Sequence, residues 1–312
     1  MRPANNLFSV VVCTYNRSKM LRGCLDSLCN QSLDKKLFEI IVVDNASTDD
    51  TPHVVEEFSP HGNIRYILET RQGLSYARNR GLLESHGKFI AYIDDDARAA
   101  PDLLDVASGV IKNLEPGVDC LGGPCHPFYT SPKPEWFLDR YEKRGFGDTS
   151  RYLLASEYIS GSNMIWAKEI LDRVGGFDVN AGVKGDYLRL GEETHAFQKL
   201  WELNRNAKVY FSPELIIYHW VPEHKMKVTY RLKRKFTEGQ YFADHMETVT
   251  SFHKFLLILD LTFQALKTSL RFLVKFHSHS HWENWIFEDG GRVAFHFGKI
   301  SGVLGFHPLF AR

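Results

Sequence analysis

The chain has 312 residues, of which 44% are hydrophobic and 24% charged, and its 38 basic residues balance 38 acidic ones. This length fits one large α/β domain or a domain with an appendage, and the neutral balance argues against a nucleic-acid partner. Five cysteines without a CxxC pair indicate reduced thiols, and the chain begins without an apolar secretory segment. The apolar stretch Phe255–Leu266 is too short to span a bilayer. We therefore expect a cytoplasmic protein that is soluble or peripheral on the inner face of the membrane.

The first 115 residues alternate between two hydrophobic patterns. Short apolar runs predict strands at Phe8–Cys13, Phe38–Val43, Ile64–Leu68 and Phe89–Ile93. Apolar residues at helical spacing predict helices at Lys19–Leu28, Asp50–Phe58, Leu74–Leu83 and Pro101–Asn113. Such alternation is typical of an α/β fold in which helices cover both faces of a mainly parallel sheet.

The pattern weakens after residue 115. Residues 122–150 are rich in Gly, Pro and aromatic residues, and they predict a long irregular loop of the kind that often binds ligands. Regular structure returns at Tyr158–Trp166, near Glu192, at Lys208–Phe211 and at Leu215–Tyr218. We expect one domain over residues 1–223 and a helical C-terminal extension over residues 224–312.

The extension is basic and amphipathic. Residues 224–277 carry ten Lys and Arg against four Asp and Glu, which favours contact with phosphates or an anionic membrane surface. Within residues 252–276, apolar side chains recur at helical spacing. These are Phe252, Phe255, Leu259, Phe263, Leu266, Leu270 and Leu273. This apolar stripe can pack onto the rest of the protein, lie in a membrane interface or form a dimer contact.

Polar clusters follow three of the predicted strands. They are Thr14-Tyr15-Asn16-Arg17, Asp44-Asn45 and Asp94-Asp95-Asp96. The carboxyl ends of parallel strands meet at one sheet edge, where ligands of α/β proteins bind. Three adjacent carboxylates repel one another, and a divalent cation with its bound phosphates would relieve that repulsion. The sequence therefore predicts a metal–phosphate site at this edge.

Six ordered motifs over about residues 7–240 resemble glycosyltransferase family 2. They are Val11–Arg17, Ile41–Asp49, Arg71–Gly81, Asp94–Asp96, Gly175–Asp178 and Gly191–Glu193. The resemblance implies a Rossmann-like GT-A fold, a nucleoside-diphosphate sugar donor, Mn²⁺ or Mg²⁺, and inversion at the anomeric carbon. It implies a saccharide or lipid-linked acceptor, with a donor half at residues 1–115 and an acceptor half at 116–223.

The resemblance also assigns roles around the donor. Asp44 would accept a hydrogen bond from the base, although it can instead cap the following helix. Donors around the base and ribose would come from the first polar cluster, and Arg78 would bind the diphosphate bidentately. Arg71 is a second diphosphate candidate that can equally be a solvated surface residue. Contacts to the donor are expected from Thr14, Tyr15, Asn16, Arg17, Asp44, Asn45, Arg71, Arg78, Asp94, Asp95, Ser162 and Asn163.

The same resemblance makes Asp96 the metal ligand, with Asp94 in support and His219 as a further ligand or a structural histidine. Glu193 is the expected general base, which would take the proton of the acceptor hydroxyl. The family more often has Asp at that position, so Glu192 is the second candidate. Both glutamates can instead be partners of a helix N-terminus.

Two other functions fit parts of the pattern. A sugar-phosphate nucleotidyltransferase uses a similar sheet, but it would need a Gly-rich, Arg-containing loop after the first strand, and Thr14–Arg17 offers none. A non-catalytic scaffolding subunit of a membrane assembly would have no need of the acids at Asp94–Asp96 and Glu193.

Overall fold

The computed structural model describes residues 6–114, 117–179, 192–244 and 251–306. The chain divides into two compact units, and a loop inserted in the first belongs to the second. The first unit comprises residues 1–128 and 142–220, and the second comprises residues 129–141 and 221–312.

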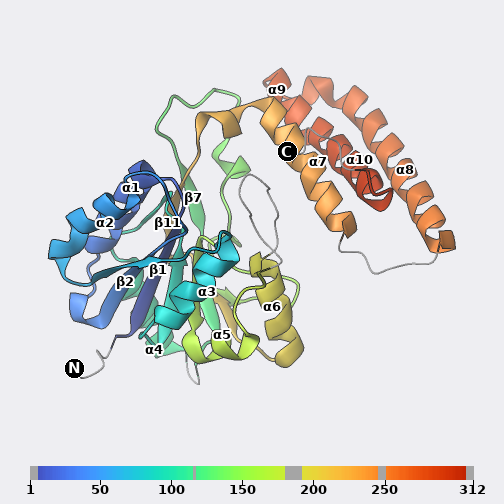
Figure 1. The fold of residues 1–312 in the computed structure, drawn as a ribbon. Helices are drawn as coiled ribbons and strands as arrows, with labels where there is room; N and C mark the ends of the chain where they lie inside the picture. Colours follow the sequence, from blue (N-terminus) through green and yellow to red (C-terminus); the bar gives the residue numbers. More distant parts are fainter. Residues whose placement is uncertain (1–5, 115–116, 180–191, 245–250, 307–312) are drawn as a thin grey trace. The chain divides into compact units, whose positions relative to one another are not determined.

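An eight-stranded sheet forms the centre of the first unit (Figure 1). In spatial order its strands are β3 (Ile64–Leu68), β2 (Phe38–Asp44), β1 (Phe8–Thr14), β4 (Phe89–Ile93), β9 (Asn163–Ala167), β6 (Cys120–Gly122), β10 (Val209–Phe211) and β8 (Arg151–Tyr152). The first four are parallel, as the sequence predicts. β9 runs antiparallel to β4 and β6, and β8 antiparallel to β10, so the second half of the sheet is mixed.

Successive residues of the central strands enter two separate cores. Val10 and Val12 of β1 face one core, whereas Val11 faces the other, as the two-residue period of a strand requires. The first core is covered by α1 (Ser18–Cys29), α2 (Thr51–Phe58) and α4 (Leu103–Asn113). The second is covered by α3 (Leu74–Glu84), α5 (Lys168–Val174) and α6 (Glu192–Leu203). β1 and β2 are buried along nearly their whole length because both of their faces are covered.

A second, three-stranded sheet lies in the same unit. Its central strand β11 (Ile217–Trp220) is antiparallel to β5 (Ala97–Ala99) and parallel to β7 (Cys125–Phe128). The pairing sets His219 opposite Ala97, directly after the run of acids. The prediction of an irregular segment missed β7, because four residues are too few to show a period.

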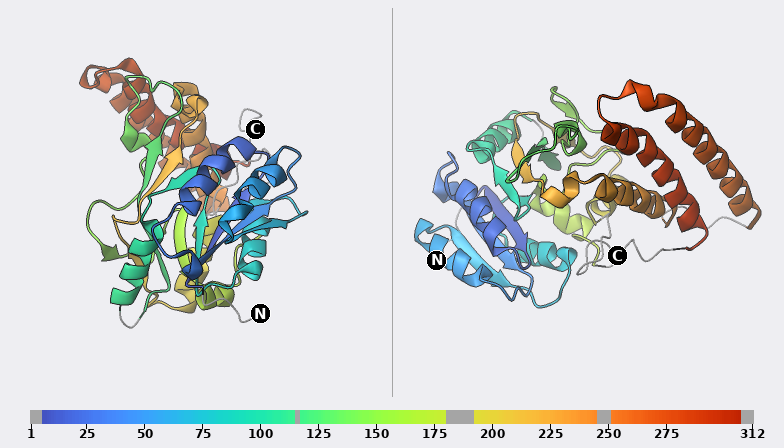
Figure 2. Two further views of the ribbon diagram at one scale, coloured as in Figure 1. Left: turned by 90° about the vertical axis from the view of Figure 1, so that its left-hand side faces the viewer. Right: turned by 90° about the horizontal axis from the view of Figure 1, so that it is seen from above.

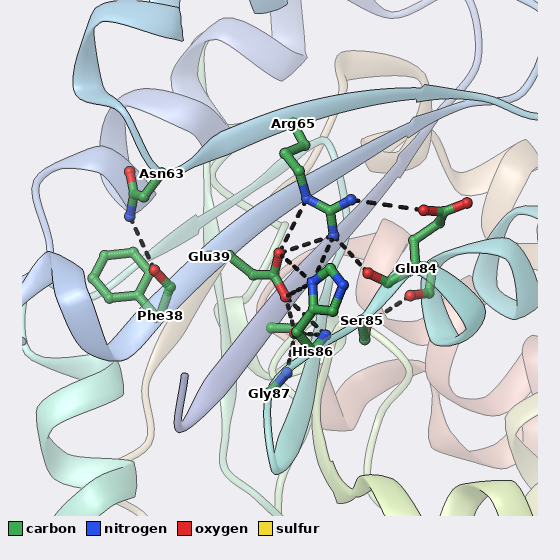
Figure 3. A network of polar contacts seen from close by, with 10 residues as sticks. Phe38, Glu39, Asn63, Arg65, Glu84, Ser85, His86 and Gly87 are labelled. Carbon is green, nitrogen blue, oxygen red and sulfur yellow. Dashed lines mark hydrogen bonds and ion pairs between the residues drawn. The ribbon is translucent and has the colours of Figure 1, made fainter. Parts of the chain in front are cut away.

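A polar network joins the strands near their N-terminal ends (Figure 3). The buried carboxylate of Glu39 accepts hydrogen bonds from Ser9 Oγ at 2.7 Å and from the backbone N–H of His86 at 2.8 Å. Its other oxygen accepts from Arg65 Nη2 at 2.9 Å. Ser9 Oγ also accepts the backbone N–H of Gly87 at 2.8 Å. The network thus connects β1, β2, β3 and the turn before β4.

The second unit is helical. It comprises α7 (Val228–Asp244), α8 (Ser251–Val274), α9 (Trp282–Trp285), a π-helical turn at 286–290 and α10 (Gly291–Val303). α7 and α10 cross closely at two glycines, because a Cβ on Gly239 would lie 2.1 Å from Phe295 O, and one on Gly298 would lie 2.0 Å from Phe236 O. Figure 2 shows the helices of this unit from two further directions. No helix in the described ranges is both long and apolar enough to cross a bilayer.

The inserted segment 129–141 packs into the helical unit through aromatic residues. The rings of Tyr141 and Phe287 pack edge to face, with their centroids 4.7 Å apart. Asn284 Nδ2 donates hydrogen bonds to Trp136 O at 2.6 Å and to Tyr141 Oη at 2.7 Å. Trp136 is buried, so it has a packing role in this unit.

The apolar stripe of α8 is exposed. The described side chains of the stripe are between 51% and 68% exposed, whereas Leu261 and Ala265 of the same helix are buried. Lys267 and Arg271 are exposed beside the stripe. The helix thus presents apolar side chains with flanking positive charges to its surroundings.

Candidate active site

The polar clusters predicted at three strand ends meet at one edge of the sheet. Thr14 is the last residue of β1 and pairs with Asp44, the last residue of β2. Thr14 Oγ1 donates to Asp95 Oδ2 at 2.8 Å, which joins β1 to the acids that follow β4. The carboxyl ends of parallel strands lie at the same edge of the sheet, so the polar residues that follow the buried strands come together there.

Two of the three acids meet a histidine from a distant part of the chain. His219 Nε2 lies 3.4 Å from Asp94 Oδ2 and 3.3 Å from Asp96 Oδ1. One ligand atom from each of the three residues lies within 4.8 Å of the others. Two carboxylates and an imidazole are groups that divalent cations accept as ligands. The residues therefore fit a divalent metal.

The third acid differs from its neighbours in its electrostatics. Burial raises the pKa of Asp95 to about 7, because Arg17 only partly offsets the burial and Asp96 adds repulsion. Arg17 Nη1 lies 3.2 Å from Asp95 Oδ1 and 2.9 Å from Asp96 Oδ2, and its side chain is half exposed. Burial also opposes ionisation of Asp94, but His219 and other neighbours outweigh it and hold the pKa of Asp94 below its usual range.

Arg78 of α3 approaches the acids, and Glu193 of α6 lies near Arg78 at Gly161. Arg78 is buried, and its Nη2 lies 3.9 Å from Asp94 Oδ1. A Cβ on Gly161 would lie 2.8 Å from Arg78 Nη2 and 3.2 Å from Glu193 Oε1. The missing side chain at residue 161 therefore allows a cation and a carboxylate to converge. Glu192 begins α6, but its side chain lies outside the described part of the chain.

Asp44 is held in place at both carboxylate oxygens. Its Oδ1 accepts the backbone N–H of Ser47 at 2.8 Å, and its Oδ2 accepts Tyr66 Oη at 2.7 Å. The Ser47 contact follows the pattern of a turn after the strand, so a local structural role for Asp44 exists beside any role in binding. Burial, together with the Asp44 carboxylate, raises the pKa of Tyr66, and Tyr66 therefore stays a hydrogen-bond donor.

Two asparagines predicted to bind the donor fasten loops in this structure. Asn45 Nδ2 donates to the backbone carbonyls of Glu69 and Arg71, and its Oδ1 accepts the N–H of Gly73 at 2.7 Å. Asn16 Oδ1 accepts the N–H of Thr48 at 2.7 Å. These contacts set the shape of the loops after β1, β2 and β3.

Of the remaining candidates, Ser162 lies at the acids, whereas Asn163 and Arg71 have partners elsewhere. Ser162 Oγ donates to Asp94 Oδ2 at 2.5 Å, so it lies at the acids. Asn163 is buried and donates to the carbonyls of Pro124 and Leu215. Arg71 is 63% exposed and forms a bidentate pair with Glu69. Tyr15 is 40% exposed after β1.

Several residues of the site escape prediction from the sequence. Tyr66 contacts Asp44 because β3 pairs with β2, and a strand pattern carries no sign of that contact. The sequence does not distinguish Gly161 from other glycines, and only the structure shows that a Cβ there would lie too close to Arg78 Nη2. Arg144, which donates to Ser162 Oγ at 3.3 Å, lies in a segment without periodicity, so its position follows only from tertiary structure.

This fold is that of the GT-A glycosyltransferases, and known structures share it. The mannosyltransferase PcManGT of Pyrobaculum calidifontis, solved with GDP-Man and Mn²⁺, matches 95% of this chain and 87% of its own with a TM-score of 0.63 at 19% identity. The Staphylococcus aureus TarS fragment solved with UDP-GlcNAc matches 96% of this chain and 92% of its own with a TM-score of 0.57 at 17% identity.

Sequence comparison agrees with the fold. The family described as Glycosyl transferase family 2 matches this chain over residues 9–174, which is more than half of its length. The glucosyl-dolichyl phosphate glucuronosyltransferase of Haloferax volcanii is 25% identical over 307 residues, which are 95% of this chain and 96% of the relative. The chain belongs to glycosyltransferase family 2, and the predicted family, fold class and transferase activity are confirmed.

Proposed function

We propose that the protein is an inverting, metal-dependent glycosyltransferase that moves a sugar from a nucleoside-diphosphate sugar to a hydroxyl group. The observation that carries this proposal is the convergence of Asp94, Asp96 and His219 with Arg78. Anionic ligands for a cation and a buried guanidinium are what a diphosphate leaving group requires. Asp44 lies at the same sheet edge, where a nucleoside base can follow the diphosphate.

The donor would extend along the ends of the parallel strands. One lone pair of the fixed Asp44 carboxylate would accept a base N–H, with Thr14, Tyr15 and Arg17 nearby as donors for the nucleoside. Asn16 and Asn45 would act indirectly, because their amides hold the loops that bear these groups. Arg78 would bind diphosphate oxygens.

Asp96, Asp94 and His219 would hold Mn²⁺ or Mg²⁺. The cation supplies charge neutralisation for the departing diphosphate. Asp95 would support this arrangement from the side, since it accepts hydrogen bonds from Thr14 and Arg17.

Glu193 would act as the general base for the acceptor hydroxyl. It would take the hydroxyl proton while the oxygen attacks the anomeric carbon, and the diphosphate would leave with the electrons of the broken C–O bond. A single displacement of this kind inverts the anomeric configuration. Glu193 Oε1 lies beside Gly161, which has no side chain to cover the carboxylate. Glu192 remains the second candidate.

The relatives support an acceptor that belongs to a glycolipid or a polysaccharide. The Haloferax volcanii relative is named for glucosyl-dolichyl phosphate, and TarS is named a poly(ribitol-phosphate) β-N-acetylglucosaminyltransferase. The solved structures carry GDP-Man and UDP-GlcNAc, so both nucleotides are candidates for the donor of this chain.

The test is a screen of UDP- and GDP-sugars for thermal stabilisation and for slow hydrolysis, with Mn²⁺, with Mg²⁺ and with EDTA. We expect one donor to release nucleoside diphosphate only when a metal is present. Release of pyrophosphate would indicate a nucleotidyltransferase. Binding of a donor without turnover in the presence of candidate acceptors would favour a scaffolding subunit.

We also propose that the extension over residues 224–277 contacts an anionic membrane surface through the stripe of α8. Exposed apolar residues flanked by Lys267 and Arg271 match an interface with apolar tails and anionic headgroups. Phe263→Ser with Leu270→Ser should reduce sedimentation with anionic vesicles, whereas Leu83→Ser, at a more exposed site on α3, should not. Unchanged sedimentation of the double variant would exclude the stripe as the contact.

A further inference from the structure

Arg144 is a fixed residue beside the acids that the proposed reaction does not use. Its backbone N–H donates to Cys125 O at 3.0 Å, and its carbonyl accepts the N–H of Cys125 at 2.9 Å. Cys125 begins β7, which pairs with the strand that carries His219. The three-stranded sheet that supplies His219 therefore also places Arg144.

The hydroxyl of Ser162 links the guanidinium of Arg144 to the carboxylate of Asp94 through two hydrogen bonds. Its Nη1 donates to Ser160 Oγ at 2.8 Å and to Ser162 Oγ at 3.3 Å, and Ser162 Oγ donates to Asp94 Oδ2 at 2.5 Å. The side chain is half-buried. Two neutral hydroxyls hold one end of the fork, so its other N–H groups keep their capacity to bind an oxyanion.

Arg144 differs from the other arginines of the site in its partners. Arg17 is paired with Asp95 and Asp96, Arg71 with Glu69, and Arg78 lies near Asp94. Among the described residues, no carboxylate comes within ion-pair distance of Arg144. Removing a guanidinium partly from water without an anionic partner is unfavourable, and a substrate anion would offset that cost.

We propose that Arg144 and Ser160 form an anion subsite beside the catalytic centre, which binds a carboxylate or phosphate group of a substrate sugar. This inference rests on the proposed function and concerns an anion other than the donor diphosphate, for which Arg78 and the metal ligands already provide. The chemistry has two sources, a uronate carboxylate on the donor or a phosphate on the acceptor. Arg144 is therefore a specificity-determining residue that selects an anionic substrate.

The donor arm compares UDP-glucuronate with UDP-glucose and GDP-mannuronate with GDP-mannose, and it also measures UDP and GDP alone. The acceptor arm compares an alkyl-phosphoryl glucose with the uncharged alkyl glucoside. Dissociation constants are measured in Mn²⁺ for the wild type, Arg144→Gln, Arg144→Lys and the control Arg173→Gln, whose side chain is 68% exposed on α5. Arg144→Lys keeps the charge without the fork, and Arg173→Gln removes an arginine distant from the acids in sequence.

We expect Arg144→Gln to raise the dissociation constant of the anionic member of one pair by about 10- to 100-fold, the range for a hydrogen bond to a charged group. The dissociation constants of the uncharged member and of the free nucleotide should change less than about twofold. Arg144→Lys should keep part of the preference for the anionic member. Equal losses for both members, or a loss of affinity for free nucleotide, would overturn the subsite. So would a wild type that binds its nucleotide but shows no preference for an anionic member. Absence of any nucleotide binding by the wild type would instead refute the proposed function.

Discussion

Replacing Gly161 with alanine should disturb the catalytic centre and leave the fold nearly intact. The added Cβ would lie 2.8 Å from Arg78 Nη2 and 3.2 Å from Glu193 Oε1, whereas ordinary contact begins at 3.4 Å. Arg78 Nη2 must therefore move from 2.8 Å to at least 3.4 Å, a shift of 0.6 Å. Glu193 must move by the smaller step from 3.2 Å to 3.4 Å.

The two consequences differ in size. The atoms that must move are ends of flexible side chains, and Ala loses less backbone entropy on folding than Gly by about 0.4–1 kcal/mol. The free energy of unfolding should thus change by less than about 1 kcal/mol. Catalysis is more sensitive, because a misplacement of about 1 Å can cost roughly 100-fold in rate. For the shorter shift we expect kcat/KM to fall about 10- to 100-fold.

The assay combines steady-state kinetics, using the donor found by the screen, with thermal unfolding. Gly109→Ala in α4 is the matched control, because a Cβ there meets no atom within 4 Å. That control should keep wild-type kcat/KM and gain stability. A Gly161→Ala variant with wild-type kcat/KM would refute the reasoning, since it would mean that the positions of Arg78 and Glu193 do not limit transfer.

Three further predictions follow from the site and from the network behind it. Glu193→Gln should lower kcat by about 10²- to 10⁴-fold and leave nucleotide affinity unchanged in titrations, whereas Glu202→Gln on the exposed face of the same helix should be silent. Wild-type turnover in Glu193→Gln would move the base to another residue. Asp96→Asn should abolish the Mn²⁺-dependent gain in nucleotide affinity measured by calorimetry, and an unchanged gain would exclude Asp96 as a ligand. Glu39→Gln should lower the free energy of unfolding at pH 7 by about 1–3 kcal/mol in urea titrations. Although burial raises the pKa of Glu39, hydrogen bonds from Ser9, His86 and Arg65 outweigh it and lower the pKa. The contribution of Glu39 is therefore complete above the unfolded pKa of about 4.3 and is lost as pH falls through the lower folded value. The difference from wild type should shrink below about pH 4, and a constant difference would contradict this origin.

The first half of the fold was predictable because local patterns determine it. Each parallel strand is a short apolar run, and the helix after the first strand shows an apolar buried face at helical spacing, with Leu21, Leu25 and Leu28 in α1. The polar clusters at the strand ends then had to meet at one edge, since parallel strands end in the same direction. The fold class follows from these features, whereas the resemblance to the family rests on the six ordered motifs.

The rest depends on contacts between distant residues, which a pattern does not show. Asn45 and Asn163 are of a residue type that often binds ligands. In the structure, however, their side-chain amides donate hydrogen bonds to backbone carbonyls of neighbouring loops. Arg144 carries no sequence signal, because two hydrogen bonds to β7 determine its position. The stripe of α8 is periodic, yet periodicity cannot decide whether an apolar face is buried or exposed.

The pairing of β11 with β5 has a consequence for the order in which the protein can mature. Asp96 and His219 are separated by 123 positions in the sequence, and they come together only when these two strands pair. A growing chain completes its parallel strands β1 to β4 long before it reaches β11, and domains fold as synthesis proceeds from the N-terminus. The acids at Asp94–Asp96 must therefore be tolerated without His219 during translation, when Arg17, made earlier, is already present to neutralise them. The two acids of the cluster are thus synthesised long before the histidine that completes it.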